Sequence, residues 1–287
     1  MKTHRHKIVV IICYLGEVPW YFGYFIHSCR YNPSVDFVVV GDVLIDSTNL
    51  PENVQVLRKN SEELQELILN KTGIRCDISH PYKLCDFKPA YGMLFNDIVK
   101  GYDFWAHGDI DVIYGDIRSF ITEDLLSNKD LICVRHDFLT GYFLLFRNND
   151  KMNRLFTLSK DYKKVFSSDR HFCFDETNFQ FHAFSENTPL SEINSEIESM
   201  MHVVKKAEMK GYIRTFFDFM VIEGLPGRLR WADGKLYYKN TYEVLLYHMI
   251  LFKKVYTPRM PVREIPSEFL ISPTRIYHRQ SRAADVN

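Results

Sequence analysis

The feature that most restricts the fold is a continuous apolar run near the N-terminus, KIVVIICY, at residues 7–14. β-branched residues dominate this run, which is typical of a central parallel strand covered on both faces. A predicted helix at residues 20–29 and a second apolar strand at residues 36–40 follow it. The order strand–helix–strand predicts an α/β fold with a mixed, mainly parallel central sheet flanked by helices. No G-x-G-x-x-G follows the first strand, so a dinucleotide site is not expected.

Short apolar strands and amphipathic helices continue to alternate along the chain, without internal repeats. Asn60, with Glu63 three residues later, predicts the start of a helix, and Gly73 predicts its end. Further on, Asp233-Gly234 separates two short apolar runs and predicts a hairpin. The remaining predicted elements are strands at residues 54–57, 102–106, 130–135 and 141–147, and helices at residues 89–101, 149–166 and 190–209.

Composition excludes several other classes of protein. Apolar residues make up 46% of the chain and charged residues 25%, as in an ordinary soluble protein, and the formal net charge is zero. No nucleic-acid partner that depends on a strong overall field is therefore expected. The six cysteines lack zinc-ligand spacing, so we expect reduced thiols in a cytoplasmic protein. The polar tail, residues 280–287, is predicted to be disordered.

The N-terminus imitates a secretion signal, because three basic residues precede the apolar run Ile8 to Leu15. This run is short and lacks a small-residue cleavage site, so a buried first strand is the preferred interpretation. No stretch of the chain reaches the ~18 apolar residues of a membrane span.

Two acidic residues follow the predicted strand at residues 102–106. Asp109 and Asp111 are separated by one residue, so they share a face if the extended backbone continues through Ile110. Two carboxylates placed in this way repel each other unless a cation or a proton lies between them. Oxygen ligands of this kind suit Mg²⁺ or Mn²⁺. The competing interpretation is a solvated turn at the end of a strand.

An apolar strand that ends in Asp-x-Asp resembles the metal motif of nucleotide-sugar glycosyltransferases with the GT-A fold. The longer segment from Tyr82 to Asp116, with YKLCDFKPAYGMLF followed by FWAHGDIDVIYGDI, resembles glycosyltransferase-like proteins of bacterial capsule and lipopolysaccharide gene clusters. The resemblance implies a GT-A-like, Rossmann-type sheet in a single domain, residues 1–279, with a C-terminal extension. Residues 1–120 would then bind the nucleotide and residues 121–279 the acceptor.

The resemblance also implies an activity, that of a hexosyltransferase-type glycosyltransferase. Such an enzyme moves a sugar from a nucleoside-diphosphate sugar to a saccharide or a lipid-linked glycan. UDP is favoured as the nucleotide because it is the commonest one in metal-dependent families. A lipid-linked acceptor would bring a cytoplasmic enzyme to the inner face of the cell membrane as a peripheral protein. The sugar, the acceptor and the stereochemical outcome stay open.

The departing pyrophosphate gains negative charge, so a cation must lie beside it. Asp111 is the first candidate ligand for Mn²⁺ or Mg²⁺, with Asp109 as a second ligand or a partner of sugar hydroxyls. Several GT-A families return to the metal with a C-terminal histidine followed by a phosphate-binding lysine. His248, with Lys253 and Lys254 after it, resembles that arrangement. A histidine in a partly buried strand is the alternative.

The nucleotide sugar has further candidate contacts. Tyr14 or Trp20 can stack on the base, although a packed aromatic residue is the alternative for each. Asp86 and Lys88, in the run CDFKP, could bind the nucleotide or sugar, or form a surface ion pair. Two residues in the segment that carries the resemblance complete the set. His107 would orient Asp109 or contact the ligand, and Gly108 would let a phosphate approach the backbone closely.

The acceptor hydroxyl needs a base if the reaction inverts the sugar. Asp175 and Glu176 are the first candidates, and Asp137, before Thr140-Gly141, is a rival. A retaining enzyme needs no dedicated base, and solvated loop acids are the ordinary alternative. Two other functions compete with transfer: a non-catalytic subunit that binds a nucleotide sugar, and a metal-dependent phosphoesterase.

Overall fold

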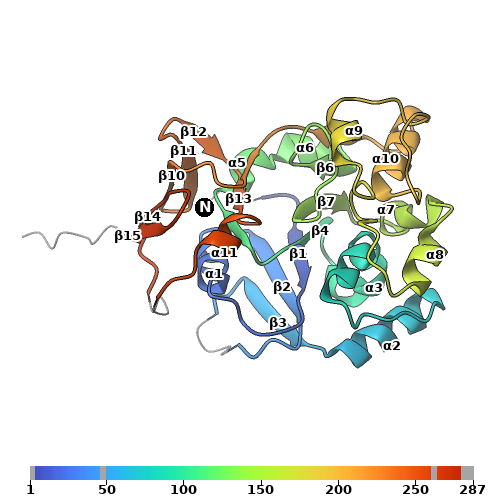
Figure 1. Cartoon of the computed structure of the whole chain (residues 1–287), viewed down its shortest axis with the longest axis horizontal. Coiled ribbons are helices and arrows are strands. Elements are labelled where there is room, and N and C mark those ends of the chain that lie inside the picture. Colours follow the sequence, from blue (N-terminus) through green and yellow to red (C-terminus); the bar gives the residue numbers. More distant parts are fainter. Residues whose placement is uncertain (1–3, 46–49, 260–263, 279–287) are drawn as a thin grey trace, which may run out of the picture. The chain divides into compact units, whose positions relative to one another are not determined.

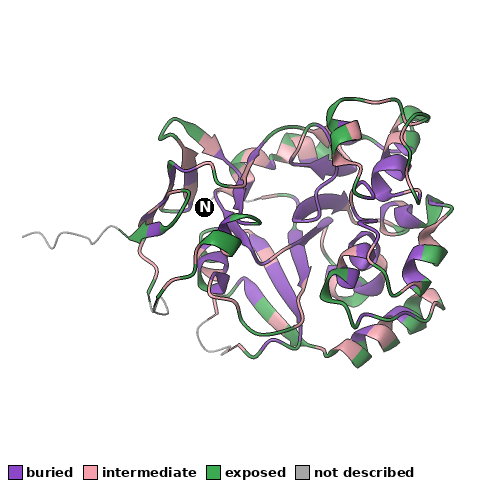
Figure 2. Ribbon diagram, in the orientation of Figure 1, coloured by how far each residue is buried: buried purple, intermediate pink, exposed green. Residues whose placement is uncertain are grey.

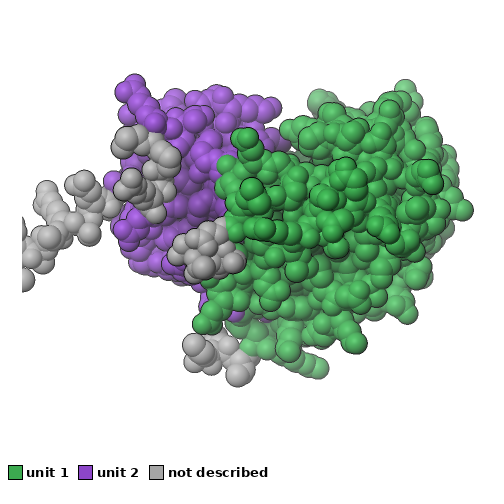
Figure 3. All heavy atoms as spheres, turned by 90° about the horizontal axis from the view of Figure 1, so that it is seen from below, with its two compact units in different colours: residues 1–18, 34–109, 121–219 green, residues 19–33, 110–120, 220–287 purple. Residues whose placement is uncertain are grey.

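The computed structural model describes residues 4–45, 50–259 and 264–278. The predicted disordered tail lies outside the described residues. Clustering of contacts divides the chain into two compact units, which Figure 3 shows in two colours. Unit 1 consists of Met1–Val18, Ser34–Asp109 and Ile121–Phe219, and unit 2 of Pro19–Pro33, Ile110–Phe120 and Met220–Asn287.

Unit 1 is built on a seven-stranded sheet in the order β3-β2-β1-β4-β7-β6-β8. The first four strands in this order run parallel to one another, whereas β7 is antiparallel to both β4 and β6. The inner strands are buried, as Figure 2 shows. The predicted mixed, mainly parallel α/β sheet is therefore confirmed. The strands are β1 (Ile8–Cys13), β2 (Val35–Gly41), β3 (Val54–Arg58), β4 (Phe104–Gly108), β6 (Leu131–Cys133), β7 (Phe143–Arg147) and β8 (Thr215–Phe217).

The helices of unit 1 include one that the sequence predicted closely. In α2 (Ser61–Thr72), the side chain of Asn60 accepts from the backbone N–H of Glu63 in a capping box, and Gly73 ends the helix in a left-handed conformation. The other described helices, several of which are labelled in Figure 1, are α3 (Tyr91–Leu94), α4 (Asn96–Val99), α6 (Glu123–Asn128), α7 (Asp150–Asn153), α8 (Tyr162–Ser167), α9 (Phe181–Ser185), α10 (Met200–Met209) and the 3₁₀ helices η2 (Pro81–Ala90) and η3 (Leu155–Leu158).

Three long helices predicted from periodicity are wrong in extent. The helix predicted at residues 89–101 is divided into the end of η2, α3 and α4, because the backbone of Phe95 leaves the helical region. The one predicted at 149–166 is divided into α7, η3 and α8, and the one at 190–209 is reduced to α10. Apolar spacing alone did not register these breaks, because it records which side of a segment is apolar and not whether the backbone stays helical.

The described part of unit 2 contains two smaller sheets and three helices, α1 (Phe22–Arg30), α5 (Ile117–Phe120) and α11 (Phe252–Val255). A five-stranded sheet has the order β12-β11-β10-β14-β15, and a three-stranded sheet the order β5-β13-β9. The predicted hairpin is confirmed, with Asp233 and Gly234 both at positive φ between β10 and β11. The strands are β5 (Val112–Tyr114), β9 (Val221–Glu223), β10 (Leu229–Ala232), β11 (Lys235–Tyr238), β12 (Tyr242–Val244), β13 (Leu246–His248), β14 (Glu268–Ile271) and β15 (Ile276–His278).

Candidate active site

The Asp-x-Asp segment is where the chain leaves the large sheet. Strand β4 ends at Gly108, and Asp109 follows it, still in unit 1. The backbone then bends at Ile110 and Asp111, and β5 begins at Val112 in the three-stranded sheet. The backbone is therefore not extended through Ile110. The reason is that Val112 pairs with a strand of a different sheet from β4. Each carboxylate is described below with its own unit.

Lys88, at the end of η2, is the centre of a charged group in unit 1. Its Nζ lies 2.6 Å from Oδ1 of Asp109, donates to the carbonyl of Gly141 at 2.9 Å, and lies 3.9 Å from Oδ2 of Asp175. Only 4% of the Lys88 side chain is exposed. Burial by itself would lower the pKa of Lys88, but the charge of Asp109 leads the effects that raise it well above its usual range. Lys88 is therefore a permanent cation.

Asp175 and Glu176 complete this group, which we call the Lys88 cluster: Lys88, Asp109, Gly141, Asp175 and Glu176. The backbone N–H of Gly141 donates to Oε1 of Glu176 at 2.6 Å. Burial raises the pKa of both Asp175 and Glu176, although Lys88 works in the opposite direction. Raised carboxyl pKa values in a polar cluster are what a proton acceptor working near neutral pH requires.

Gly141 has to be glycine for this geometry. A Cβ atom built on it would lie 2.7 Å from Oδ2 of Asp175 and 3.3 Å from Oε1 of Glu176. His107, on β4, is buried, and its Nδ1 lies 3.0 Å from the Gly141 carbonyl. Burial, and then the charge of Lys88, lower the pKa of His107 well below its usual range, so the ring is neutral and donates to that carbonyl. Within the described residues, His107 makes no hydrogen bond to Asp109.

Asp86 holds the segment that precedes the acidic pair. Its carboxylate is fully buried and pairs with Lys83, 3.0 Å away, rather than with Lys88. It also accepts the backbone N–H groups of Phe172 and Phe174, each at 3.0 Å. The surface ion pair considered from the sequence is therefore wrong, because this pair lies in the interior. Asp86 fixes the backbone immediately before Asp175.

Asp137 has a different set of partners. Arg135 forms an ion pair with it at 2.7 Å, and the hydroxyl of Ser185 donates to it at 2.8 Å. Burial would raise the pKa of Asp137, but Arg135 and Ser185 outweigh that effect and lower it to about 2. Such a carboxylate is a weak proton acceptor at neutral pH.

Unit 2 contains a second charged group around Asp111, which we call the Asp111 group: Asp111, Glu223, His248 and Lys253. Nε2 of His248 lies 3.5 Å from Oδ2 of Asp111, and Nζ of Lys253 lies 2.7 Å from the same oxygen. The backbone N–H of Met249 also donates to the Asp111 carbonyl at 2.9 Å. Burial would raise the pKa of Asp111, yet His248 and Lys253 hold it well below the ordinary carboxyl range. Asp111 is therefore ionised, as a metal ligand must be.

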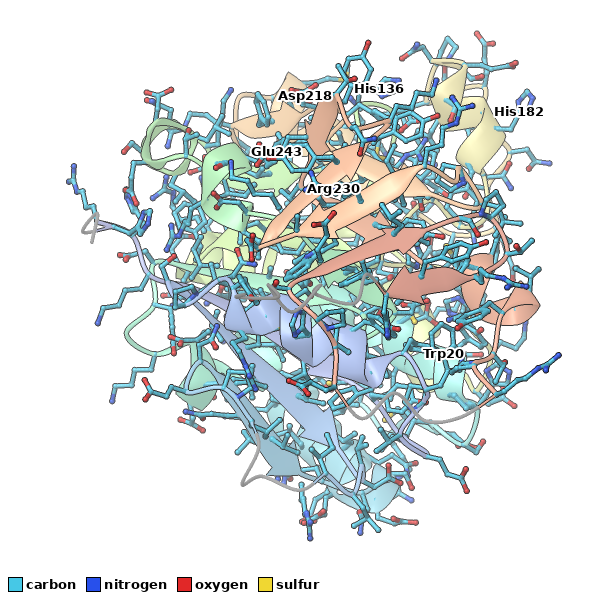
Figure 4. The ribbon with its side chains drawn as sticks, turned by 90° about the vertical axis from the view of Figure 1, so that its left-hand side faces the viewer. Trp20, His136, His182, Asp218, Arg230 and Glu243 are labelled. Atoms are coloured by element: carbon cyan, nitrogen blue, oxygen red, sulfur yellow. The ribbon has the colours of Figure 1, made fainter. Side chains whose placement is uncertain are left out.

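The remaining predicted contacts are dispersed. The hydroxyl of Tyr14 donates to the carbonyl of Glu17 at 3.1 Å. Trp20, labelled in Figure 4, belongs to an aromatic group of unit 2 in which its ring centroid lies 5.2 Å from that of Tyr256. Lys254 lies exposed on α11, and Gly108 is the last residue of β4. None of the predicted site residues lines the pocket of about 480 Å³ on the five-stranded sheet, where Arg228 and Lys239 lie.

Comparison with known proteins now identifies the family. A family profile matches residues 10–280. The chain belongs to the family of unknown function DUF6625. No curated protein matches this DUF6625 chain in sequence.

Among solved structures, the DUF6625 chain is similar to three glycosyltransferase structures. The galactosyltransferase LgtC in complex with donor and acceptor sugar analogs is 11% identical over 76% of each chain, with a TM-score of 0.35. An active-site mutant of LgtC is 12% identical over 84% of this chain and 86% of that one, with a TM-score of 0.35. Mouse xyloside xylosyltransferase 1 in its apo form is 8% identical over 84% and 97%, with a TM-score of 0.38.

Two residues of these groups were not predicted from the sequence. Gly141 was noted only as the first residue of a predicted strand, and Glu223, 3.1 Å from Nδ1 of His248, was not considered at all. Gly141 follows the threonine that ends the predicted loop and carries no motif that would distinguish it. Glu223 ends a strand of three residues, too short for a clear periodic signal.

Among the described helices, none has both the length and the apolarity needed to cross a bilayer.

Proposed function

We propose that this DUF6625 protein is a metal-dependent glycosyltransferase that moves a sugar from a nucleoside-diphosphate sugar, with UDP favoured, to a saccharide or lipid-linked glycan. The observation that carries the proposal is the Asp111 group. An ionised, buried carboxylate with an imidazole nitrogen 3.5 Å away offers the oxygen and nitrogen donors that Mn²⁺ accepts and Mg²⁺ tolerates. Asp109 is only two residues from Asp111 along the chain, so it is the natural further ligand.

When bound, the divalent cation would draw negative charge from the departing nucleoside diphosphate. The chain's own residues supply the rest. Lys253, whose side chain is 25% exposed, can leave Asp111 and pair with a phosphate oxygen. In an inverting reaction, Asp175 or Glu176 would accept the proton of the acceptor hydroxyl, since burial keeps their pKa values high. Lys88 would keep its positive charge beside these carboxylates throughout the reaction, because its pKa lies well above the usual range.

The sequence resemblance favours a role in synthesis of a bacterial surface polysaccharide, such as capsule or lipopolysaccharide. We place the enzyme in the cytoplasm, at the inner membrane face when the acceptor is lipid-linked. The two lysines of α11, the partly exposed Lys253 and the exposed Lys254, suit an anionic donor more than a second protein.

The proposal is tested by incubating the purified full chain with a panel of nucleotide sugars and Mn²⁺, and by measuring release of the free nucleotide. We expect release from one donor, lost on chelation and restored by added metal. UDP binding that is independent of metal and without turnover would favour a binding subunit instead. Phosphate release from simple phosphodiesters without sugar transfer would favour a phosphoesterase.

The Asp111→Asn variant localises the activity. We expect a loss of more than about 100-fold in turnover, because replacing the carboxylate by an amide removes the negative charge of the metal ligand and alters its coordination geometry. Asp218→Asn is the matched control, since Asp218 is exposed and, among the described residues, its carboxylate accepts only the neighbouring backbone N–H of Phe219. Near-wild-type turnover of Asp111→Asn at both low and saturating Mn²⁺ would contradict the site.

A further inference from the structure

His248 is the middle member of a three-residue row across the small sheet of unit 2. Strand β13 lies between β5 and β9, and His248 is the register partner of Val112 on one side and of Glu223 on the other. Directly paired residues on neighbouring strands project from the same face of a sheet. The side chain of Glu223 therefore lies beside the imidazole ring because the strand register places it there.

The two ring nitrogens of His248 have different neighbours. Nδ1 lies 3.1 Å from Oε1 of Glu223, within hydrogen-bonding distance. Nε2 lies 3.5 Å from Oδ2 of Asp111. A carboxylate accepts hydrogen bonds and donates none, so a hydrogen bond to Glu223 requires the proton on Nδ1. In the neutral ring the lone pair is then on Nε2, which faces Asp111.

We propose that Glu223 is a positioning residue that holds neutral His248 in the Nδ1–H tautomer and so presents Nε2 to a divalent cation shared with Asp111. This inference rests on the proposed metal-dependent function and names one further residue of that site. The physical basis is general: the hydrogen bond made by one ring nitrogen decides which nitrogen can bind a metal. Glu223 itself touches neither the cation nor the substrate in this role.

A purely structural role makes a different prediction. If Glu223 only helps β9 and β13 to pair, any substitution that keeps the sheet intact leaves the tautomer and the metal affinity unchanged. The backbone bonds of the parallel pair β9–β13 do not involve the glutamate side chain, so the sheet can persist without it. The two roles are therefore separable by experiment.

The first measurement is the tautomer of His248 in the metal-free full chain. Histidine labelled with ¹⁵N is observed by NMR at a pH where the ring is neutral, and His248→Gln identifies its signals. We expect the wild type to show a protonated Nδ1 and an unprotonated Nε2, and Glu223→Leu to show a mixture or the opposite tautomer. An unchanged Nδ1–H tautomer in Glu223→Leu would overturn the inference.

The second measurement is Mn²⁺ affinity by isothermal titration calorimetry. We expect Glu223→Leu to bind Mn²⁺ about 10-fold to 100-fold more weakly than the wild type, and Glu223→Gln to lie between them because its side-chain oxygen still accepts from Nδ1. Glu243→Leu is the matched control, because it removes the same charge from unit 2. Glu243, labelled in Figure 4, pairs with Lys235 on the five-stranded sheet. Equal affinity in Glu223→Leu and Glu243→Leu would overturn the inference.

These outcomes also distinguish the inference from the proposed function. A wild type that binds no Mn²⁺ defeats the proposed function and the metal part of this inference together. The NMR result then still decides whether Glu223 sets the tautomer. If Glu223→Leu does not fold, Glu223→Gln carries both measurements, and unchanged values in that variant count against the role.

Discussion

The Lys88 cluster and the Asp111 group use the same chemistry but differ in the exposure of their lysines. The Lys88 side chain is 4% exposed, whereas that of Lys253 is 25% exposed. Each ammonium group lies close to one aspartate oxygen, 2.6 Å from Asp109 and 2.7 Å from Asp111. The difference is therefore in access to solvent and not in the contact itself.

This difference separates a permanent charge from an exchangeable one. A buried ammonium cannot be replaced by water, so Lys88 has to stay with its carboxylates for the fold to persist. The Lys253 side chain is 25% exposed, so it can reach solvent or another anion, whereas its partner Asp111 stays buried. We infer that unit 1 uses its lysine to keep acids in place, and unit 2 uses its lysine to occupy a site that a metal would take.

The sharpest way to break this comparison is to remove each lysine in turn. Lys88→Met should lower the free energy of unfolding by about 3–5 kcal/mol, because it leaves buried carboxylates without a partner. Lys253→Met should cost less, because Lys253 is 25% exposed and Asp111 keeps its contact with His248. Urea unfolding followed by circular dichroism measures both values. Similar costs for the two variants would show that exposure does not distinguish the lysines.

A smaller effect should distinguish two candidate bases by pH. The pKa of Asp175 is raised in the folded state, so its contribution to stability is fully present below its unfolded pKa and is lost as the pH rises through the folded value. The pKa of Asp137 is lowered from 3.8 to about 2, so its contribution is present above pH 3.8 and is lost as the pH falls toward 2.

Two asparagine variants test these opposite signs. Asp175→Asn should flatten the decline in unfolding free energy as the pH rises above the ordinary carboxyl range. Asp137→Asn should flatten the decline on the acidic side. Urea unfolding across the pH range, with the wild type beside each variant, gives the slopes. The same slope change in both variants would mean that the two carboxylates do not differ in environment as described.

The smallest expected effect concerns the exchange of the Lys253 ammonium group for a metal ion at Asp111. Lys253→Met should bind Mn²⁺ up to about fivefold more tightly in the absence of nucleotide, since the metal no longer displaces an ammonium group. The same variant should bind UDP with Mn²⁺ more weakly, because a phosphate partner is lost. Calorimetry with and without UDP measures both constants. Weaker Mn²⁺ binding in the nucleotide-free variant would contradict the exchange.

Much of the fold was predictable because local patterns agreed with the tertiary structure. The β-branched run at the N-terminus is β1, Asn60 and Glu63 cap α2, and Asp233-Gly234 turns the hairpin. The long helices failed because periodicity records which side is apolar and not where the backbone leaves the helical region. The break at Phe95 is of this kind.

The candidate site divides in a similar way. Lys88, Asp175 and Glu176 were nominated separately, and the structure brings them together around the backbone of Gly141. Asp86 and Asp137 were also nominated from the sequence. In the structure, Asp86 pairs with Lys83 in the interior and Asp137 pairs with Arg135. Residue type and spacing nominate acids, but they do not say which cation each acid will meet.

By itself, the amino-acid sequence determined six strands of the large sheet, the best helix cap, the turn and the acidic segment after β4, because each depends on neighbours within a few residues. Only the tertiary structure decided that Lys88 is buried and that Glu223 meets His248. Those outcomes depend on strand pairing between segments more than 20 residues apart, as the separation of 25 between Glu223 and His248 shows. Burial and charge pairing are properties of that assembled environment, so no local pattern encodes them.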